Sequence, residues 1–431
     1  MLVVQRTCYT PDMTRMLRKL LPPKIKDASY RACRKLYFAT LPRRRVSLDR
    51  LLLGDEGGIA AERYARMTDN PLRPSTPIEK WPHVALLRLY DEIGDEALTP
   101  TRFHETDYAA NARLCLDITG NYFRARTEDA ILDVAKDFVG RYSSTEANDK
   151  RSSRKEPDMG HSPHGSPILV RPIRYSDCYQ VIDGHHRAAI ALARGEKSVD
   201  LAVVRPAVLT PLQSLLLDVT WASGPRELYQ PIESPEIVKG WTLVRKCTDR
   251  LQKMQAFLET HGPRPQTGAS YIDIACNYGW FVGRMQALGY DVRGVERDPT
   301  ACRLATLING VDPERIIRSD VVRFLRGENK RFDVVSCLSL LHHFALGLGV
   351  IDAVTLIRHL DSLTGQVLFL DTGQNHEAWF RTSLPEWDAD FIEQWLLCNT
   401  TFKRIIRLGV DEDNKPPYQG NYGRILFACV R

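Results

Sequence analysis

Residues 271–296 alternate between apolar and polar positions in a way that predicts a strand, a tight turn, a helix and a second strand. The apolar run 271–274 includes one acid, Asp273, and leads into a turn through 277–279. Apolar residues then recur at helical spacing, and a second apolar run ends at Glu296, about twenty residues after the turn. Such a turn aims backbone N–H groups at a ligand, and a carboxylate at this spacing can accept both ribose hydroxyls of a nucleoside.

This turn resembles the signature of the class I S-adenosylmethionine (SAM)-dependent methyltransferases. The family pattern is Asp-x-Gly-x-Gly-x-Gly, and its four places are taken here by Asp273, Ala275, Asn277 and Gly279. Two glycines are therefore replaced. Asn tolerates the left-handed conformation that a glycine supplies, and Ala adds one methyl group near the cofactor. A lone turn of this type also suits NAD or no ligand, so the strands that follow decide between these interpretations.

The resemblance continues to the end of the chain. The third to seventh strands of the family correspond to apolar runs at 315–318, 332–343 with its post-strand segment, 367–372, 402–408 and 424–430. The last two runs fit the family's terminal antiparallel pair. The resemblance implies that 263–431 is an α/β domain with a Rossmann-like, seven-stranded sheet and that SAM is its cofactor. A long helix predicted over 237–258 resembles the helices that cover the cofactor in this family.

The resemblance also assigns the cofactor contacts residue by residue. It implies that Asp273 and the turn hold the amino-acid part of SAM, that Glu296 takes the ribose hydroxyls and that Asp320 and Val321 flank the adenine. The full set of implied cofactor-binding residues is Asp273, Ala275, Asn277, Gly279, Glu296, Asp320, Val321 and Ser339.

The methyl acceptor is expected over the end of the fourth strand, near Ser339, His342 and His343. We predict His342 as the catalytic residue: it would remove the proton of a hydroxyl acceptor, or only position a phosphate or carboxylate. The alternative is a histidine that merely packs at a helix start. No Asn/Asp-Pro-Pro-Tyr follows this strand, which disfavours methylation of adenine or amide nitrogen. Asp371, His376 and Glu377 are secondary acceptor-side candidates.

A second candidate site lies in the first half of the chain. Two predicted strands, 169–173 and 179–182, lead into Asp183-Gly184-His185-His186-Arg187 and then into a helix. A helix N-terminus favours anions, and His and Arg placed there predict a phosphate site. The alternative is a structural cap without catalysis.

The Asp183–Arg187 motif resembles the ParB/sulfiredoxin-like superfamily, and within it the free-serine kinases. The resemblance implies that Gly184, His185, His186 and Arg187 bind the phosphates of ATP with Mg²⁺, and that Asp183 and His185 assist phosphotransfer. The family takes its base from an early loop. Asp55 and Glu56 lie in that loop here, and we select Glu56. The reactive cysteine of sulfiredoxin is absent from the motif.

Charge is concentrated at the N-terminus. The first fifty residues hold thirteen Lys or Arg and three acids, against a net charge of +6 for all 431 residues. Residues 13–21 form a basic amphipathic pattern that suits either an anionic membrane surface or packing on the body of the protein. No recognition motif accompanies the charge, so nucleic-acid binding is not expected. The polar stretch 143–166 predicts a loop.

The ten cysteines include no CxxC pair, which predicts reduced thiols and no metal site. The first residues are too polar for a signal peptide, so we expect a cytoplasmic protein, with membrane-surface contact at the inner face through the basic arm. Four segments are predicted: a basic helical arm, an α+β ParB/sulfiredoxin-like domain with a helical insertion, a helical bridge and the methyltransferase. They cover 1–43, 44–207, 208–262 and 263–431.

Three hypotheses follow for the whole chain. The first is a methyltransferase with an ATP-dependent kinase domain, acting on the hydroxyl or phosphate oxygen of a glycan or small molecule, by analogy with the bifunctional enzymes that cap bacterial O-antigen chains. The second gives the first domain a nucleotide-sensing role without turnover. The third is a nucleic-acid-associated methyltransferase, for which salt-dependent binding would be the sign. Oligomeric state does not follow from the sequence.

Overall fold

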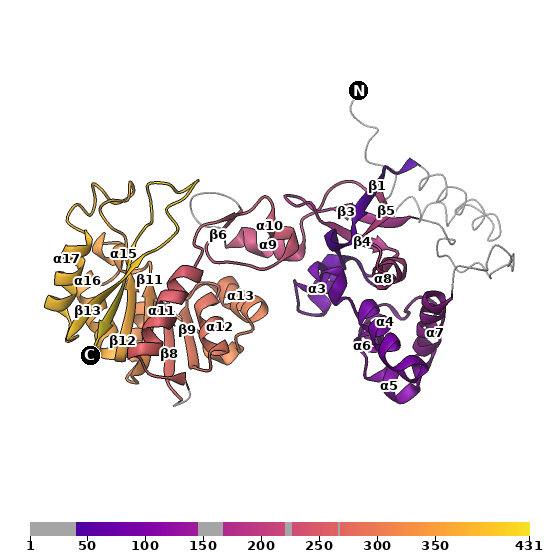
Figure 1. Ribbon diagram of the computed structural model, residues 1–431, viewed down its shortest axis with the longest axis horizontal. Coiled ribbons are helices and arrows are strands. Elements are labelled where there is room, and N and C mark those ends of the chain that lie inside the picture. The colour runs from indigo at the N-terminus through magenta and orange to yellow at the C-terminus, as the bar shows by residue number, and fades with distance from the viewer. Residues whose placement is uncertain (1–39, 145–166, 220–225, 266–267) are drawn as a thin grey trace, which may run out of the picture. The chain divides into compact units, whose positions relative to one another are not determined.

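The computed structural model describes residues 40–144, 167–219, 226–265 and 268–431. Residues 1–39 of the predicted basic arm and most of the predicted loop 143–166 therefore lie outside the described residues. The chain divides into two compact units, Met1–Thr210 and Pro211–Arg431, each drawn in Figure 1. None of the helices in the described part of the chain has the length and apolar character that a membrane span requires.

The first unit is built on a five-stranded mixed sheet with the order β1-β5-β3-β4-β2. β1 pairs antiparallel with β5, β5 parallel with β3, β3 antiparallel with β4, and β4 parallel with β2. The strands are β1 (Arg43–Ser47), β2 (Leu51–Leu52), β3 (Ile168–Pro172), β4 (Tyr179–Asp183) and β5 (Ser198–Val203).

Helices between β2 and β3 form the insertion that the sequence predicts, and α8 follows β4. They are α3 (Ala61–Met67), α4 (Pro82–Ile93), α5 (Pro100–His104), α6 (Asp107–Thr119), α7 (Asp129–Ser143) and α8 (His185–Ala193). Local chemistry sets their ends: the Thr106 side chain accepts a hydrogen bond from the N–H of Ala109 at the start of α6, and Gly120 ends that helix in the left-handed conformation. Insertion and sheet share one hydrophobic core, so this unit is a single folded body.

The second unit contains a seven-stranded sheet with the order β10-β9-β8-β11-β12-β14-β13. β14 pairs antiparallel with both β12 and β13, and the other pairs are parallel. The strands are β8 (Ser270–Ile274), β9 (Asp291–Glu296), β10 (Ile316–Arg318), β11 (Phe332–Leu338), β12 (Thr364–Asp371), β13 (Arg404–Val410) and β14 (Ile425–Val430). This confirms the predicted α/β class with a Rossmann-like seven-stranded sheet.

Helices cover both faces of this sheet, which is why its central strands are apolar on both sides (Figure 1). Within β8, Tyr271 packs into the core beneath α11 and α12, whereas Ile272 packs into the core beneath α14, α16 and α17. The helices are α11 (Thr248–His261), α12 (Trp280–Ala287), α13 (Pro299–Asn309), α14 (Val321–Gly327), α15 (Leu341–Ala345), α16 (Ala353–Leu363) and α17 (Ala389–Asn399).

The segment before the sheet corrects one prediction. This segment begins with α9 (Pro211–Asp218) and β6 (Glu227–Leu228). The expected helix over 237–258 is then broken into three elements, which are α10 (Pro235–Val238), β7 (Thr242–Leu243) and α11. β6 and β7 pair parallel. The breaks fall at left-handed residues, Gly240 with φ 84° and Cys247 with φ 66°, which a continuous helix cannot contain.

A buried ionic cluster ties this segment to the far end of the sheet. Arg245 Nη2 lies 3.1 Å from Asp371 Oδ2 and 3.0 Å from Asp411 Oδ2, and Arg250 Nη1 lies 3.0 Å from Asp371 Oδ2. Burial alone would raise the pKa of Asp371, but the two guanidinium groups outweigh it and hold the pKa well below its ordinary value. The cluster joins the residues before β8, the end of β12 and the loop after β13.

We predict that Arg245→Met lowers the free energy of unfolding of the second unit by about 3–5 kcal/mol, because it leaves buried carboxylates without their cation. Urea unfolding measures this. Arg284→Met is the matched control, since the partner of Arg284 is Glu233, whose side chain is 85% exposed, and its loss should cost less than about 1 kcal/mol. Equal losses in the two variants would contradict the role given to the cluster.

Candidate functional site

The carboxyl ends of the central strands of the second unit meet where the strand order reverses. β9 lies on one side of β8, and β11 lies on the other. In open α/β sheets the crevice outside the strand ends at such a point is the usual ligand site. The residues predicted to bind SAM lie at the carboxyl ends of these strands or on the segments that follow them.

The turn after β8 holds three residues in the left-handed conformation. Ala275 has φ 63°, Asn277 has φ 52° and Gly279 has φ 67°. Gly279 cannot be replaced easily, because a Cβ there would lie 2.7 Å from the Cβ of Ala305 on α13. Ala275 bears a backbone strain of about 1–2 kcal/mol that a glycine would not. The turn thus keeps the sharp shape of a glycine-rich loop despite two substitutions.

Two amide side chains from outside the turn fasten it in place. Gln230 Nε2 donates to the carbonyl of Cys276 and Gln230 Oε1 accepts from the N–H of Trp280, each at 3.2 Å. Asn309 Nδ2 donates to the carbonyl of Tyr278 at 2.7 Å. Neither residue was predicted to hold this turn. A glutamine beside a proline carries no signal of its own, and its partners are about fifty positions away.

Glu296, at the end of β9, is joined directly to this turn. Its Oε2 accepts from the N–H of Asn277 at 3.0 Å, and its Oε1 accepts from the N–H groups of Arg297 and Asp298 at 2.8 and 2.9 Å. A carboxylate offers about four acceptor positions, so room for about one further donor remains. The structure thus brings Glu296 and the turn together, as the spacing predicts, but part of its capacity is used by the backbone.

Asp273 lies deeper than expected for a ligand-binding acid. It is 2% exposed, and Ser336 Oγ donates to its Oδ1 at 2.6 Å. Burial raises its pKa to about 7, with the hydrogen bond from Ser336 opposing this. A direct contact between Asp273 and the amino-acid part of SAM stays a prediction.

Asp320 and Val321 follow β10 at the next strand end. Asp320 Oδ1 accepts from the N–H groups of Val322 and Arg323, at 2.9 and 3.2 Å, and so caps α14. The N–H of Ser319 donates to the carbonyl of Glu296 at 3.0 Å, which links this segment to the ribose-binding candidate. Their position beside Glu296 is consistent with the predicted adenine contact, which stays a prediction.

The predicted acceptor side lies at the ends of β11 and β12. Ser339 has φ 57°, and its N–H and Oγ both donate to Asp371 Oδ1, at 2.7 and 2.8 Å. His342 is 4% exposed, and its Nδ1 accepts from the N–H of Gly373 at 3.2 Å. Burial lowers the pKa of His342 well below its ordinary value, and Arg424 lowers it further. His342 is therefore a neutral imidazole at physiological pH.

Arg424 braces this side of the site. It forms two hydrogen bonds with Glu377, at 2.8 and 2.9 Å, and its Nη1 donates to Ser339 Oγ at 3.1 Å. Glu377 is fully buried and also accepts from the N–H groups of Gln374 and Tyr422. Of the secondary candidates, Glu377 and Asp371 are thus structural acids in ion pairs, and His376 Nε2 donates to the carbonyl of Tyr422 at 2.7 Å. Sequence reasoning did not identify Arg424.

The donor and acceptor groups at the carboxyl ends of β8, β9 and β10 suit the parts of SAM. The turn would hold the amino-acid part, Glu296 would accept from the ribose, and the residues after β10 would border the base. When bound, SAM supplies an electrophilic methyl group on a sulfonium, and the leaving group is a neutral thioether. The part left to the protein is alignment of the acceptor.

In the first unit, the loop after β2 places its two acids differently. Asp55 accepts from the N–H of Ala61 at 2.9 Å and pairs with Arg171 at 3.3 Å. Glu56 is 1% exposed and lies between two histidines, 3.7 Å from His83 Nε2 and 4.0 Å from His185 Nε2. Burial raises the pKa of Glu56, and it also raises the pKa of Asp55. His83, on the inserted helix α4, was not identified from the sequence.

The Asp183–Arg187 motif lies where β4 passes into α8. Gly184 has φ 107°, and a Cβ there would lie 2.9 Å from Arg187 Nη2. Arg187 Nη2 lies 3.6 Å from Asp183 Oδ2, and His185 Nε2 donates to the carbonyl of Leu53 at 2.8 Å. The structure therefore brings Gly184, His185 and Arg187 to the helix start, close to the loop of Glu56.

His186 points to a different environment. Its ring stacks on Phe138 and Phe123 with centroid distances of 4.1 and 4.6 Å, and its Nε2 is 3.0 Å from the hydroxyl of Tyr108. These partners belong to the helical insertion. They give His186 a packing role, and its predicted contact with a phosphate remains a prediction.

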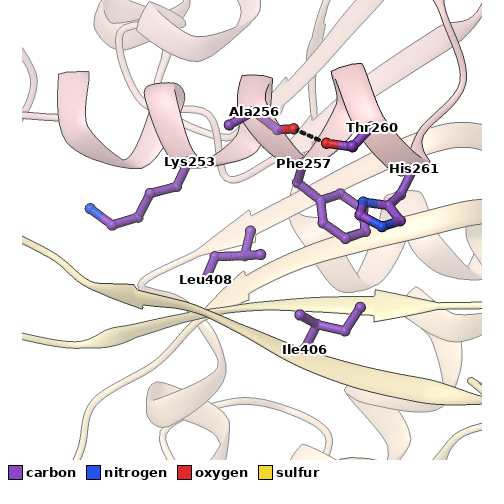
Figure 2. A pocket seen from close by; sticks show the side chains of 7 residues that line it. All are labelled: Lys253, Ala256, Phe257, Thr260, His261, Ile406 and Leu408. Atoms are coloured by element: carbon purple, nitrogen blue, oxygen red, sulfur yellow. Dashed lines mark hydrogen bonds between the residues drawn. The ribbon is translucent and has the colours of Figure 1, made fainter.

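Two further observations limit the search for sites. No group of three or more His, Cys, Asp or Glu side chains suited to hold a metal occurs within the described ranges. A groove of about 430 Å³ lies between α11 and β13, shown in Figure 2, and none of the predicted site residues lines it. Its lining residues are Lys253, Ala256, Phe257, Thr260, His261, Ile406 and Leu408.

The strand order, the left-handed turn and the acid after the second parallel strand define the second unit as a nucleoside-binding α/β domain of the methyltransferase type. Residues 247–404 match the methyltransferase domain family. The second unit therefore carries a methyltransferase domain. No curated protein matches the chain at a significant level.

Several solved structures are similar to part of this chain. The bifunctional kinase-methyltransferase WbdD is 17% identical over 51% of this chain and 46% of that chain, with a TM-score of 0.39. The magnesium protoporphyrin IX methyltransferase ChlM from Synechocystis PCC 6803, with bound SAM, is 21% identical over 42% of this chain and 79% of that chain, with a TM-score of 0.32. The chain thus spans a little less than half of the length of WbdD.

We predict that Gln230→Leu weakens SAM binding about tenfold, because the turn loses both of its hydrogen bonds to the amide. Isothermal titration of the purified protein with SAM measures this. Glu233→Ala is the control, since this exposed neighbour in the same segment touches Arg284 and not the turn. Unchanged affinity in Gln230→Leu, with the fold intact by circular dichroism, would show that the turn holds its shape without help.

Proposed function

We propose that this protein transfers the methyl group of SAM to an oxygen, of a hydroxyl or a phosphate, on a glycan or small-molecule acceptor. The observation that carries the proposal is the direct hydrogen bond between Glu296 and the left-handed turn at the point where the strand order reverses. Oxygen is favoured because the segment after β11 holds Ser339 and His342 and lacks the Asn/Asp-Pro-Pro-Tyr residues suited to amino or amide nitrogen.

We further propose that the first unit binds ATP with Mg²⁺ and phosphorylates the acceptor before or beside its methylation. Supporting this, a left-handed Gly184 opens α8, Arg187 lies at the same helix start, and Glu56 is within 4.0 Å of His185. A buried carboxylate of raised pKa is suited to remove a proton from a hydroxyl. Phosphorylation and methylation by one chain would together cap a glycan end.

A specific observation favours a second candidate for this unit, a nucleotide-sensing module without turnover. Glu56 is 1% exposed, whereas a base must touch the hydroxyl that it deprotonates. In this alternative the loop and α8 would bind the phosphates and the methyltransferase would act alone. A role at a membrane surface or on nucleic acid would depend on the basic arm.

Separate sites predict separate losses of binding. In isothermal titrations, Glu296→Ala should weaken SAM binding about 10- to 100-fold and leave ATP–Mg²⁺ binding unchanged, because a charged acceptor is removed from one site alone. Arg187→Ala should do the reverse. Loss of both ligands in either variant would mean misfolding or one shared site, and absence of ATP binding in the unaltered protein would reduce the first unit to a scaffold.

Glu56→Gln tests turnover in the first unit. We expect ATP consumption in the presence of a panel of glycan, amino-acid and nucleoside acceptors to fall at least about a hundredfold, since the amide keeps the shape of the side chain but cannot accept a proton. Glu62→Gln, an exposed neighbour, is the control. If the unaltered protein consumes no ATP with the panel but binds it, the sensing role is correct and the kinase proposal is wrong.

A further inference from the structure

The loop after β12 fixes the protonation pattern of His342. The N–H of Gly373 approaches His342 Nδ1 at 3.2 Å. A backbone N–H can donate and cannot accept, so Nδ1 must offer its lone pair. In the neutral imidazole the single proton then sits on Nε2. To act as a base toward an acceptor at Nε2, His342 would first have to leave Gly373.

The Nε2–H group of His342 has no hydrogen-bond partner among the described residues. No side chain or backbone group within the described ranges hydrogen-bonds to Nε2 of His342, and this atom is not completely buried. The ring itself is held by contacts with His343, at a centroid distance of 4.3 Å, and with Phe380, at 4.9 Å. A fixed N–H donor is therefore left for a ligand at this strand end.

The charged groups around the histidine pair keep both rings neutral. Arg424 acts on both His342 and His343, and Arg297 acts on His343, in each case in the direction that disfavours a positive imidazole. Asp371 is the carboxylate that acts on His342, and it is paired with Arg245 and Arg250, as Arg424 is paired with Glu377. A neutral ring with its proton on Nε2 can donate one hydrogen bond to an anion.

Two further donors on the same loop have no partner. Thr372 Oγ1 and Gln374 Nε2 are buried, and no hydrogen-bond partner for either atom occurs in the described part of the chain. They flank Gly373, whose N–H holds His342. Buried polar atoms without partners are rare in folded proteins and mark places where a ligand or water completes the bonding.

We propose that the methyl acceptor reaches this site already as an oxyanion, a carboxylate or a phosphate, and that His342 holds it as a hydrogen-bond donor through Nε2 instead of removing a proton. This inference rests on the proposed methyl transfer to oxygen and narrows its substrate class. Of the two roles that the sequence analysis leaves open for His342, base or positioning residue, it selects the positioning role.

The chemistry balances without a base. A lone pair of the acceptor oxyanion forms the new O–C bond to the methyl carbon, and the C–S bond breaks with its electron pair passing to the sulfur. One negative and one positive charge are neutralised, and no proton is released. A hydroxyl acceptor would instead release one proton, for which the Nε2–H tautomer offers no acceptor.

Nitrogen-15 NMR of the full-length protein labelled at histidine tests the tautomer without any acceptor. We expect the signals of His342, assigned by their loss in His342→Gln, to show a protonated Nε2 and an unprotonated Nδ1 throughout pH 5.5–8.5, a window about the ordinary histidine pKa of roughly 6.5. A proton on Nδ1, or titration within that window, would overturn the inference.

Anion binding to the complex with S-adenosylhomocysteine, the demethylated product, tests the substrate class. Inorganic phosphate and acetate are titrated separately, and at least one should shift the Nε2 signal of His342; which one does so identifies the acceptor group. His342→Asn, whose carbonyl can still accept from Gly373, should weaken that binding about 10- to 100-fold, whereas His342→Gln, whose amide can donate in place of Nε2, should retain most of it.

The outcomes separate the two proposals. If S-adenosylhomocysteine itself does not bind, the proposed function fails. If it binds and neither anion shifts His342, or if the Asn and Gln variants bind the anion equally well, the proposed function survives and the oxyanion inference is wrong.

Discussion

The buried attraction between Arg245 and Asp371 is the constraint on which the methyltransferase unit depends most. Asp371 ends β12, and Gly373, directly after this strand, donates its N–H to His342. Arg245 precedes α11, and Asp411 follows β13, so one guanidinium group holds three segments that are distant in sequence. Charges removed from water are costly unless each has its partner, so the geometry of all three segments is specified together.

The predicted cofactor side is organised by hydrogen bonds to the backbone instead. Glu296, which follows the turn in the sequence, accepts a hydrogen bond from its backbone. Gln230, which precedes the turn, also hydrogen-bonds to its backbone. The turn of a typical family member relies on glycines for its shape. Here the external amides and the carboxylate supply restraint that compensates for the strain at Ala275.

Patterns of neighbouring residues were sufficient to predict the fold class of the second unit and the position of its candidate site at the strand ends. The apolar runs, the Asp273–Gly279 turn and the acid after the second strand carried the resemblance to class I methyltransferases. That resemblance implied the seven-stranded sheet, and the structure confirms that fold class. The break between α10 and α11 was missed because the apolar spacing is continuous across Gly240, whose left-handed backbone leaves no mark on periodicity.

The remaining site residues depend on contacts that no local pattern contains. Arg245 meets Asp411 across 166 positions, and Arg424 meets Ser339 across 85. His83 belongs to an insertion whose position against Glu56 follows from the packing of several helices. His342 was found from its place after a strand, but its tautomer is set by one backbone N–H and required coordinates.

The order of strands in the second unit has a consequence for biosynthesis. β14 is the last strand along the chain, yet it lies inside the sheet between β12 and β13. Until β14 leaves the ribosome, β12 has an unpaired edge and β13 has no strand to join, so the sheet cannot close while it is being translated. The first unit, whose sheet is complete by Val203, has no such delay. Folding on the ribosome should therefore proceed in two stages, and the nascent methyltransferase unit is the part exposed to chaperones and to aggregation through an open strand edge.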